Sequence, residues 1–188
     1  MKNQTLQDEE KVILLKLARR TVEAAARRNA LPEVKLAEYS ASLQEPGASF
    51  VTLTINNNLR GCIGALEAYQ PLVKDVITHA AAAATEDYRF LPVSLEEVNL
   101  LKIEISVLTK PEVLTYSTAV DLMNALIPGK MGVILKDGHR RATFLPQVWE
   151  QLPDKQEFLS HLCQKMGAPG HLWKTKNLEV FTYQVEEF

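Results

Sequence analysis

The spacing of apolar side chains along the chain predicts four main helices. Residues 6–28 repeat apolar positions at helical spacing, with acidic residues at the start and arginines at the end, an order that complements the helix dipole. A second helix, with a stripe of valines and alanines, is predicted from Pro71 to Glu86. Residues 116–130 predict a short helix, and residues 154–168 predict one that begins after Asp154 as N-cap.

Apolar and polar residues alternate in the segments between these helices, which predicts strands. Residues 49–55 and 59–64 flank an asparagine turn, and residues 131–145 predict a second hairpin that turns at Asp137-Gly138. Residues 101–109 and 178–188 predict single strands. Because no regular βαβ repeat occurs, we predict an α+β fold with a largely antiparallel sheet and flanking helices.

The first hairpin has two possible registers, and they differ in where its apolar side chains point. A two-residue loop would set Ile55 opposite Arg60, whereas a three-residue loop matches apolar residues across the strands. We therefore predict the three-residue loop. It turns the following residues to the core: Val51, Leu53, Ile55, Leu59 and Ile63. It pairs the following residues on the opposite face: Thr54 with Arg60, Thr52 with Cys62, and Phe50 with Gly64.

Composition and charge narrow the class of protein. The 188 residues are 46% hydrophobic, which suits one globular domain, and the net charge of -2 gives no support for wholesale nucleic-acid binding. Two distant cysteines argue against a disulfide framework and for reduced thiols. The first twenty residues lack the pattern of a secretory signal, and no apolar run approaches the roughly 20 residues that a membrane span needs. We expect a cytoplasmic protein that does not enter a membrane.

The segment LRGCIG, residues 59–64, holds the main candidate for chemistry. Arg60 lies two residues from Cys62, and a nearby cation favours the thiolate, which is the reactive form of cysteine. The alternative is that Cys62 is a small, half-buried packing residue. Gly61 and Gly64 admit two interpretations of equal weight, the close approach of a ligand or simple packing under Phe50.

The remaining polar residues give weaker signals. The four histidines do not cluster, and Asp75 with His79 is predicted to form a surface pair on a helix. We find no zinc spacing, phosphate loop or dinucleotide fingerprint, so we predict no metal and identify no cofactor. Arg141 and Thr143 share a strand face just before Pro146, where a strand-to-helix corner is the alternative interpretation.

An ordered set of segments resembles the AMME chromosomal region candidate gene 1 domain family. The set begins with LRGCIG and continues with the alanine-rich helix, the segment 87–90 (DYRF), residues 103–109 (IEISVLT) and residues 141–165. Within that family the chain is similar to the AmmeMemoRadiSam system protein A group, over about Leu43 to Phe188. Tyr88 stands where the family usually has proline, and residues 56–58 replace a commonly glycine-containing turn.

The resemblance implies a single domain over residues 1–188, with helix 6–28 packed on it and the signature motif at 59–64. It also implies two unequal subdomains that share a cleft. Finally, it implies that the protein works with a Memo-like protein and a radical SAM protein.

Three hypotheses for the function follow. The first is an accessory enzyme or modification component that binds a small anionic or nucleotide-like ligand, with Arg60 holding the anion and Cys62 as nucleophile. Its remaining ligand-binding residues would be Gly61, Gly64, Asp87, Arg89, Glu104, Arg141 and Thr143. The second is a non-catalytic scaffold or binding protein of the same system. The third and weaker one is RNA or nucleotide binding through arginines 60, 89, 140 and 141. We favour the first, with the second as the alternative.

Overall fold

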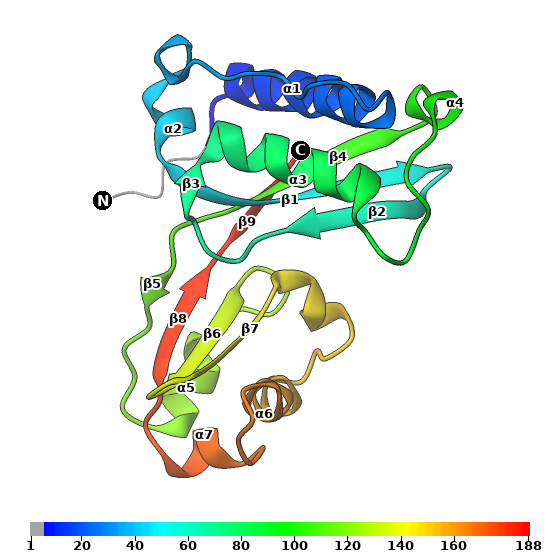
Figure 1. Ribbon diagram of the computed structural model, residues 1–188. Helices are drawn as coiled ribbons and strands as arrows, with labels where there is room; N and C mark the ends of the chain where they lie inside the picture. Colours follow the sequence, from blue (N-terminus) through cyan, green and yellow to red (C-terminus); the bar gives the residue numbers. More distant parts are fainter. Residues whose placement is uncertain (1–5) are drawn as a thin grey trace. The chain divides into compact units, whose positions relative to one another are not determined.

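The computed structural model describes residues 6–188, and the chain divides into two compact units. The first unit comprises residues up to Leu108 together with Glu186–Phe188, and the second comprises Thr109–Val185. Helices and antiparallel sheets occur in both units, which confirms the predicted α+β class (Figure 1). None of the helices formed by residues 6–188 combines the length and the apolar character that a membrane crossing requires.

The first unit is a sheet covered by two helices. Its helices are α1 (Asp8–Ala26), α2 (Ala41–Gln44), α3 (Leu72–Thr85) and α4 (Leu95–Val98), with a 3-10 turn at Leu36–Glu38. Its strands are β1 (Pro46–Ile55), β2 (Asn58–Gly64), β3 (Gln70–Pro71), β4 (Lys102–Leu108) and β9 (Val185–Glu187). The strand order is β2-β1-β4-β9, with β3 paired to β1, so β2 and β9 lie at the edges.

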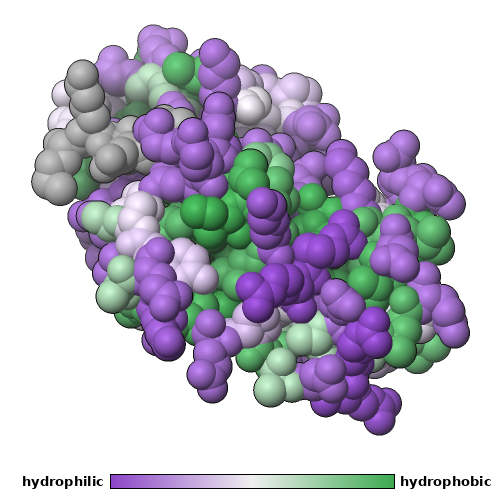
Figure 2. All heavy atoms as spheres, turned by 90° about the horizontal axis from the view of Figure 1, so that it is seen from above, coloured by the Kyte–Doolittle hydropathy of each residue, from purple (hydrophilic) through white to green (hydrophobic). Residues whose placement is uncertain are grey.

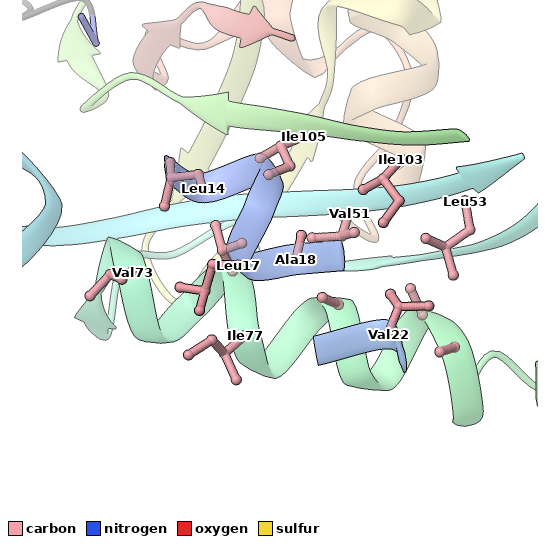
Figure 3. Packing of buried hydrophobic residues seen from close by; sticks show 14 of the residues in the cluster. Leu14, Leu17, Ala18, Val22, Val51, Leu53, Val73, Ile77, Ile103 and Ile105 are labelled. Atoms are coloured by element: carbon pink, nitrogen blue, oxygen red, sulfur yellow. The ribbon is translucent and has the colours of Figure 1, made fainter. Parts of the chain in front are cut away.

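Apolar side chains from α1, α3 and one face of the sheet make the core of the first unit. Leu14 and Val22 of α1 and Val51 and Ile105 of the sheet are completely buried in it (Figure 3). Burial of each such side chain contributes about 1.5–3 kcal/mol. Because side chains alternate along a strand, the residues between these core positions point away from α1 and α3.

The first hairpin corrects the predicted register near its turn. Thr52 pairs with Cys62 and Phe50 with Gly64, as predicted, but Ile55 pairs with Asn58 and Thr54 with Leu59. The loop therefore has two residues, Asn56 and Asn57, both at positive φ, and Arg60 forms a bulge. Asparagine tolerates this left-handed conformation, and one extra residue restores the apolar match beyond the bulge. The prediction that Leu59 turns to the core is wrong, because Leu59 is 42% exposed.

The second unit is a smaller sheet with its own core. Its strands are β5 (Glu112–Val113), β6 (Gly132–Asp137), β7 (Arg140–Phe144) and β8 (Glu179–Tyr183), in the order β5-β8-β6-β7. Its helices are α5 (Ala119–Ala125), α6 (Lys155–Lys165) and α7 (Leu172–Thr175), with a 3-10 segment at Pro146–Glu150. The indole of Trp149 stacks on Phe158 with ring centroids 3.6 Å apart.

Two details of the second unit differ from the prediction. The β6–β7 hairpin turns at Gly138 and His139, one residue later than predicted, because Asp137 still pairs with Arg140. The strand predicted at 178–188 is split at Gln184 into β8 and β9, which belong to different sheets. Asp154 is the N-cap of α6, as predicted, and accepts hydrogen bonds from the amides of residues 156 and 157.

Candidate functional site

The LRGCIG segment forms the edge strand β2, and the segment after α3 covers that edge. The N–H of Cys62 donates to Oδ2 of Asp87 at 2.9 Å, and Nη2 of Arg89 lies 3.5 Å from the carbonyl oxygen of Cys62. An edge strand carries backbone groups that the sheet does not pair. The segment 87–90 therefore lies against LRGCIG, and its side chains form hydrogen bonds with backbone groups of β2 that the sheet leaves unpaired.

Asp87 and Arg89 form a paired unit within this contact. Nε of Arg89 donates to Oδ1 of Asp87 at 2.8 Å, and Nη2 donates to Oδ2 at 2.6 Å. These bonds, with the amides of Cys62 and Arg89, hold the pKa of Asp87 well below its usual range despite its burial. The pKa of Arg89 is raised in turn by Asp87. Both carboxylate oxygens of Asp87 thus already accept hydrogen bonds from the protein.

Arg60 is bound in the same way to Glu97 of α4. Its Nε donates to Oε1 at 2.7 Å and its Nη2 to Oε2 at 2.9 Å, a two-point contact between guanidinium and carboxylate. Glu97 also accepts the N–H of Ser94 at 2.8 Å, closing the capping box of α4. Arg60, followed by the amide of Ser94, lowers the pKa of Glu97 from 4.5 to about 2.

The ring of Phe90 is shared by the two arginines. The guanidinium carbon of Arg60 lies 5.8 Å from the ring centroid, and that of Arg89 lies 5.5 Å from it. Both distances are within the range of cation–π attraction. Two arginines, two carboxylates and one aromatic ring therefore form a single cluster at the edge of the sheet, which we call the motif cluster: Arg60, Asp87, Arg89, Phe90 and Glu97.

Cys62 is half-buried and accepts a hydrogen bond from a neighbouring strand. The hydroxyl of Thr52 lies 3.3 Å from its Sγ atom. Thr52 pairs with Cys62 on one side and with Glu104 of β4 on the other. These three side chains form a row across the sheet, on the face that points away from α1 and α3.

At both glycines of the motif, another part of the protein lies too close to leave room for a side chain. A Cβ atom on Gly61 would lie 2.2 Å from the carbonyl oxygen of Ala83 in α3. A Cβ atom on Gly64 would lie 2.3 Å from the ring of Phe50. Packing against the protein's own backbone and side chains is therefore sufficient reason for glycine at both positions.

Arg141 and Thr143 belong to β7 of the second unit. The hydroxyl of Thr143 lies 3.0 Å from that of Tyr183, and both side chains are buried. Burial raises the pKa of Tyr183, so its hydroxyl stays protonated near neutral pH. The structure brings Arg60, Gly61, Cys62, Asp87 and Arg89 together in the first unit, and a role for Arg141 and Thr143 in ligand binding stays a prediction.

A buried polar cluster on α3 corrects another prediction. Asp75 and His79 were expected at the surface, but Asp75 is completely buried and His79 is 5% exposed. Oδ2 of Asp75 accepts the N–H of Ser49 at 2.8 Å and its hydroxyl at 2.7 Å, and lies 3.1 Å from Nδ1 of His79. The Ser49 hydroxyl approaches that same ring nitrogen, at 3.5 Å. A serine nucleophile needs the other nitrogen of the histidine, so this cluster does not have the geometry of a catalytic triad.

Sequence reasoning missed Glu97 and Phe90 in the motif cluster. The signal for Glu97 was present, because Ser94 and Glu97 have the spacing of a capping box. The pairing of Glu97 with Arg60 depends on the fold and had no local signal. Within residues 6–188, no three histidine, cysteine, aspartate or glutamate side chains come together as a metal-ion site.

Comparisons with known proteins place the chain in a family. The AMMECR1 family model matches residues 15–188. A protein from Thermofilum pendens is 37% identical over 97% of this chain and 91% of its own length, and one from Methanothermobacter thermautotrophicus is 35% identical over 100% and 98%. The crystal structure of the uncharacterized protein PH0010 from Pyrococcus horikoshii is 34% identical, with a TM-score of 0.79 over 97% of this chain and 92% of that one. The chain therefore belongs to the AMMECR1 family.

Proposed function

We propose that the protein is a non-catalytic binding component, in which LRGCIG and the segment 87–90 form a rigid wall of the first unit. The supporting observation is that the charged groups of the motif cluster are paired with one another. Arg60 binds Glu97 with two nitrogens, and Arg89 binds Asp87 with two nitrogens. An anionic ligand would have to displace a carboxylate from a two-point contact before it could use either arginine.

The acid and base groups near Cys62 support the same proposal. A general base works best when its pKa lies near the working pH. The carboxylates of Asp87 and Glu97 both have lowered pKa values, and they are weak bases at neutral pH. His79, which alone among the four histidines of the sequence belongs to the first unit, is held by Asp75. The motif cluster therefore offers no base that would activate a nucleophilic thiol, and Glu104, two strands away in the same row, is separated from Cys62 by Thr52.

The partners of this binding component are proposed from the family resemblance: a Memo-like protein and a radical SAM protein. The test compares Cys62→Ala and Asp87→Asn with the unchanged chain, in a cellular complementation assay and in capture of each purified partner. We expect Cys62→Ala to retain both activities. We expect Asp87→Asn, which loses the charge that binds Arg89 and so loosens the cover of the β2 edge, to weaken capture.

One outcome would contradict this proposal. If the Cys62→Ala protein folds and captures both partners but fails in complementation, Cys62 has a chemical role. Circular dichroism and the unfolding midpoint of the variant serve as the folding control.

One observation favours an accessory enzyme as second candidate. The Thr52 hydroxyl donates to Sγ of Cys62, so the sulfur is held in place by a neighbouring strand while it remains only half-buried. The test is the rate of iodoacetamide labelling of Cys62 across pH, measured by mass spectrometry of its peptide. Labelling that rises with pH as for an ordinary thiol supports the binding component, whereas fast labelling that is constant below neutral pH supports the enzyme.

A further inference from the structure

A groove in the first unit lies between α1 and the segment that leads into β4, and it shares no residue with the motif cluster. Its volume is about 770 Å³, within the range of about 300–1,000 Å³ that is typical of ligand sites. The side of the molecule that carries α1 exposes hydrophobic surface between strongly hydrophilic side chains (Figure 2). The groove is lined by four basic and four aliphatic residues: Lys16, Arg19, Arg20, Lys102, Leu15, Leu100, Leu101 and Ile103.

The positive charges of the groove have no carboxylate partners. Lys16 lies one helical turn before Arg19 and Arg20, so the three side chains share a face of α1, and Lys102 adds a fourth charge from the start of β4. Within the described residues 6–188, none of these four forms an ion pair with a carboxylate. The two arginines of the motif cluster differ, because each binds a carboxylate with two nitrogens. An anion in the groove therefore has no carboxylate to displace.

Arg19 holds one of these charges at a fixed point. Its Nη1 donates to the carbonyl oxygen of Val98 at 2.8 Å, and its Nη2 donates to that of Leu101 at 2.6 Å. Both acceptors are neutral, so they position the guanidinium without cancelling its charge. The other three basic residues are exposed, and their long side chains can follow a charged group at the rim of the groove.

The apolar side chains of the groove are all aliphatic. Leu101 and Ile103 are 4% and 9% exposed, Leu15 is half-buried, and Leu100 is 64% exposed. Among the described residues that line the groove, none is aromatic and none carries a side-chain amide. A nucleobase is usually held by aromatic stacking and by hydrogen bonds to its edges, and an inorganic anion makes no use of apolar surface. A hydrocarbon chain, in contrast, is stabilised by burial against aliphatic side chains.

We propose that this groove binds a free phosphate or diphosphate ester of an aliphatic chain. The phosphate group contacts Lys16, Arg20 and Lys102, next to the fixed charge of Arg19, because guanidinium and ammonium groups are the side chains that bind phosphate in proteins. The hydrocarbon chain lies along the aliphatic residues of the groove, Leu100 included. This inference concerns residues outside the motif cluster and stands independently of the function proposed for that cluster.

The first test compares a whole ligand with its parts. Isothermal titration calorimetry of the full chain uses geranyl diphosphate as the probe, inorganic diphosphate as the charged group alone, and ADP as a diphosphate ester without an aliphatic chain. We expect geranyl diphosphate to bind at least tenfold more tightly than either of the other two, because it alone uses both the basic and the aliphatic residues.

Two pairs of variants locate the binding. The double variant Lys16→Glu/Arg20→Glu should weaken the binding of geranyl diphosphate at least tenfold, whereas Lys74→Glu, at an exposed position of α3 outside the groove, should change it less than twofold. Leu100→Ser should weaken binding at least threefold, whereas Leu91→Ser, which is 83% exposed and lies outside the groove, should leave it unchanged. All of these positions are exposed, and circular dichroism with the urea midpoint serves as the folding control.

Anionic membrane lipids share the chemistry of the proposed ligand, and a sedimentation assay separates the two sources. We expect the chain to stay in the supernatant when vesicles of phosphatidylcholine and phosphatidic acid are sedimented. Four results would overturn the proposal: inorganic diphosphate or ADP binding as tightly as geranyl diphosphate, no binding of geranyl diphosphate at millimolar concentration, unchanged affinity in the double variant, or sedimentation with the vesicles that the double variant abolishes.

Discussion

The pair formed by Arg60 and Glu97 gives the sharpest prediction, and Glu97→Gln is the change that tests it. Glutamine keeps a carbonyl oxygen for the N–H of Ser94 but loses the charge that binds Arg60. A pKa lowered from 4.5 to about 2 corresponds to at most about 3.4 kcal/mol, at about 1.36 kcal/mol per pKa unit. Glu97 is 28% exposed, and solvent screening reduces this figure. We expect the variant to lose about 1.5 kcal/mol of unfolding free energy at neutral pH.

The pH dependence of this loss has a definite sign. Because the pKa of Glu97 is lower in the folded state, its contribution is fully present above pH 4.5 and is lost as the pH falls towards 2. The difference between the two proteins should be constant from pH 6 to 8 and should shrink below pH 4.5.

The measurement must report on the first unit. Both tryptophans, Trp149 and Trp173, lie in the second unit, so fluorescence would follow the wrong part of the chain. Urea-dependent hydrogen exchange of the buried β1 residue Val51 is the suitable probe. Glu96→Gln, at an exposed position of the same helix, is the matched control. A loss below about 0.5 kcal/mol at pH 7, or one that is undiminished at pH 2.5, would refute the reasoning.

Three further predictions follow from the motif and the two thiols. Asp87→Ala, which removes the oxygen that accepts the Cys62 N–H, should speed hydrogen exchange at the Cys62 amide at least tenfold, and Glu86→Ala should leave that rate unchanged; equal rates in both variants would show that Asp87 does not anchor the edge. Gly61→Ala should lower the unfolding free energy by about 2 kcal/mol, because the added methyl group meets a backbone carbonyl of α3, and an unchanged urea midpoint would contradict this close contact. Iodoacetamide should label Cys62 but not Cys163 in the folded protein, since Cys163 is completely buried and burial raises the pKa of its thiol. Mass spectrometry with and without urea checks this, and labelling of both thiols without urea would count against it.

The amino-acid sequence by itself determined most of the elements of the fold. Helical spacing over residues 6–28 located α1, and alternation over residues 101–109 located β4, because each pattern reflects one buried face. The asparagines at 56–58 marked a turn. The apolar match of Val51 with Ile63 fixed the register beyond it. Local patterns of this kind depend only on which residues are apolar and how they are spaced.

Tertiary structure decided which groups of the candidate site are free to act. Nothing near Arg60 in the sequence indicates that Glu97, thirty-seven residues later, accepts hydrogen bonds from two of its three guanidinium nitrogens. The pattern of α3 placed Asp75 and His79 on a helix, but the partners that satisfy the buried carboxylate, Ser49 among them, come from segments outside that helix. Ion pairs and strand edges join residues that are far apart along the chain, and their partners are therefore set by how the elements pack rather than by any local sequence pattern.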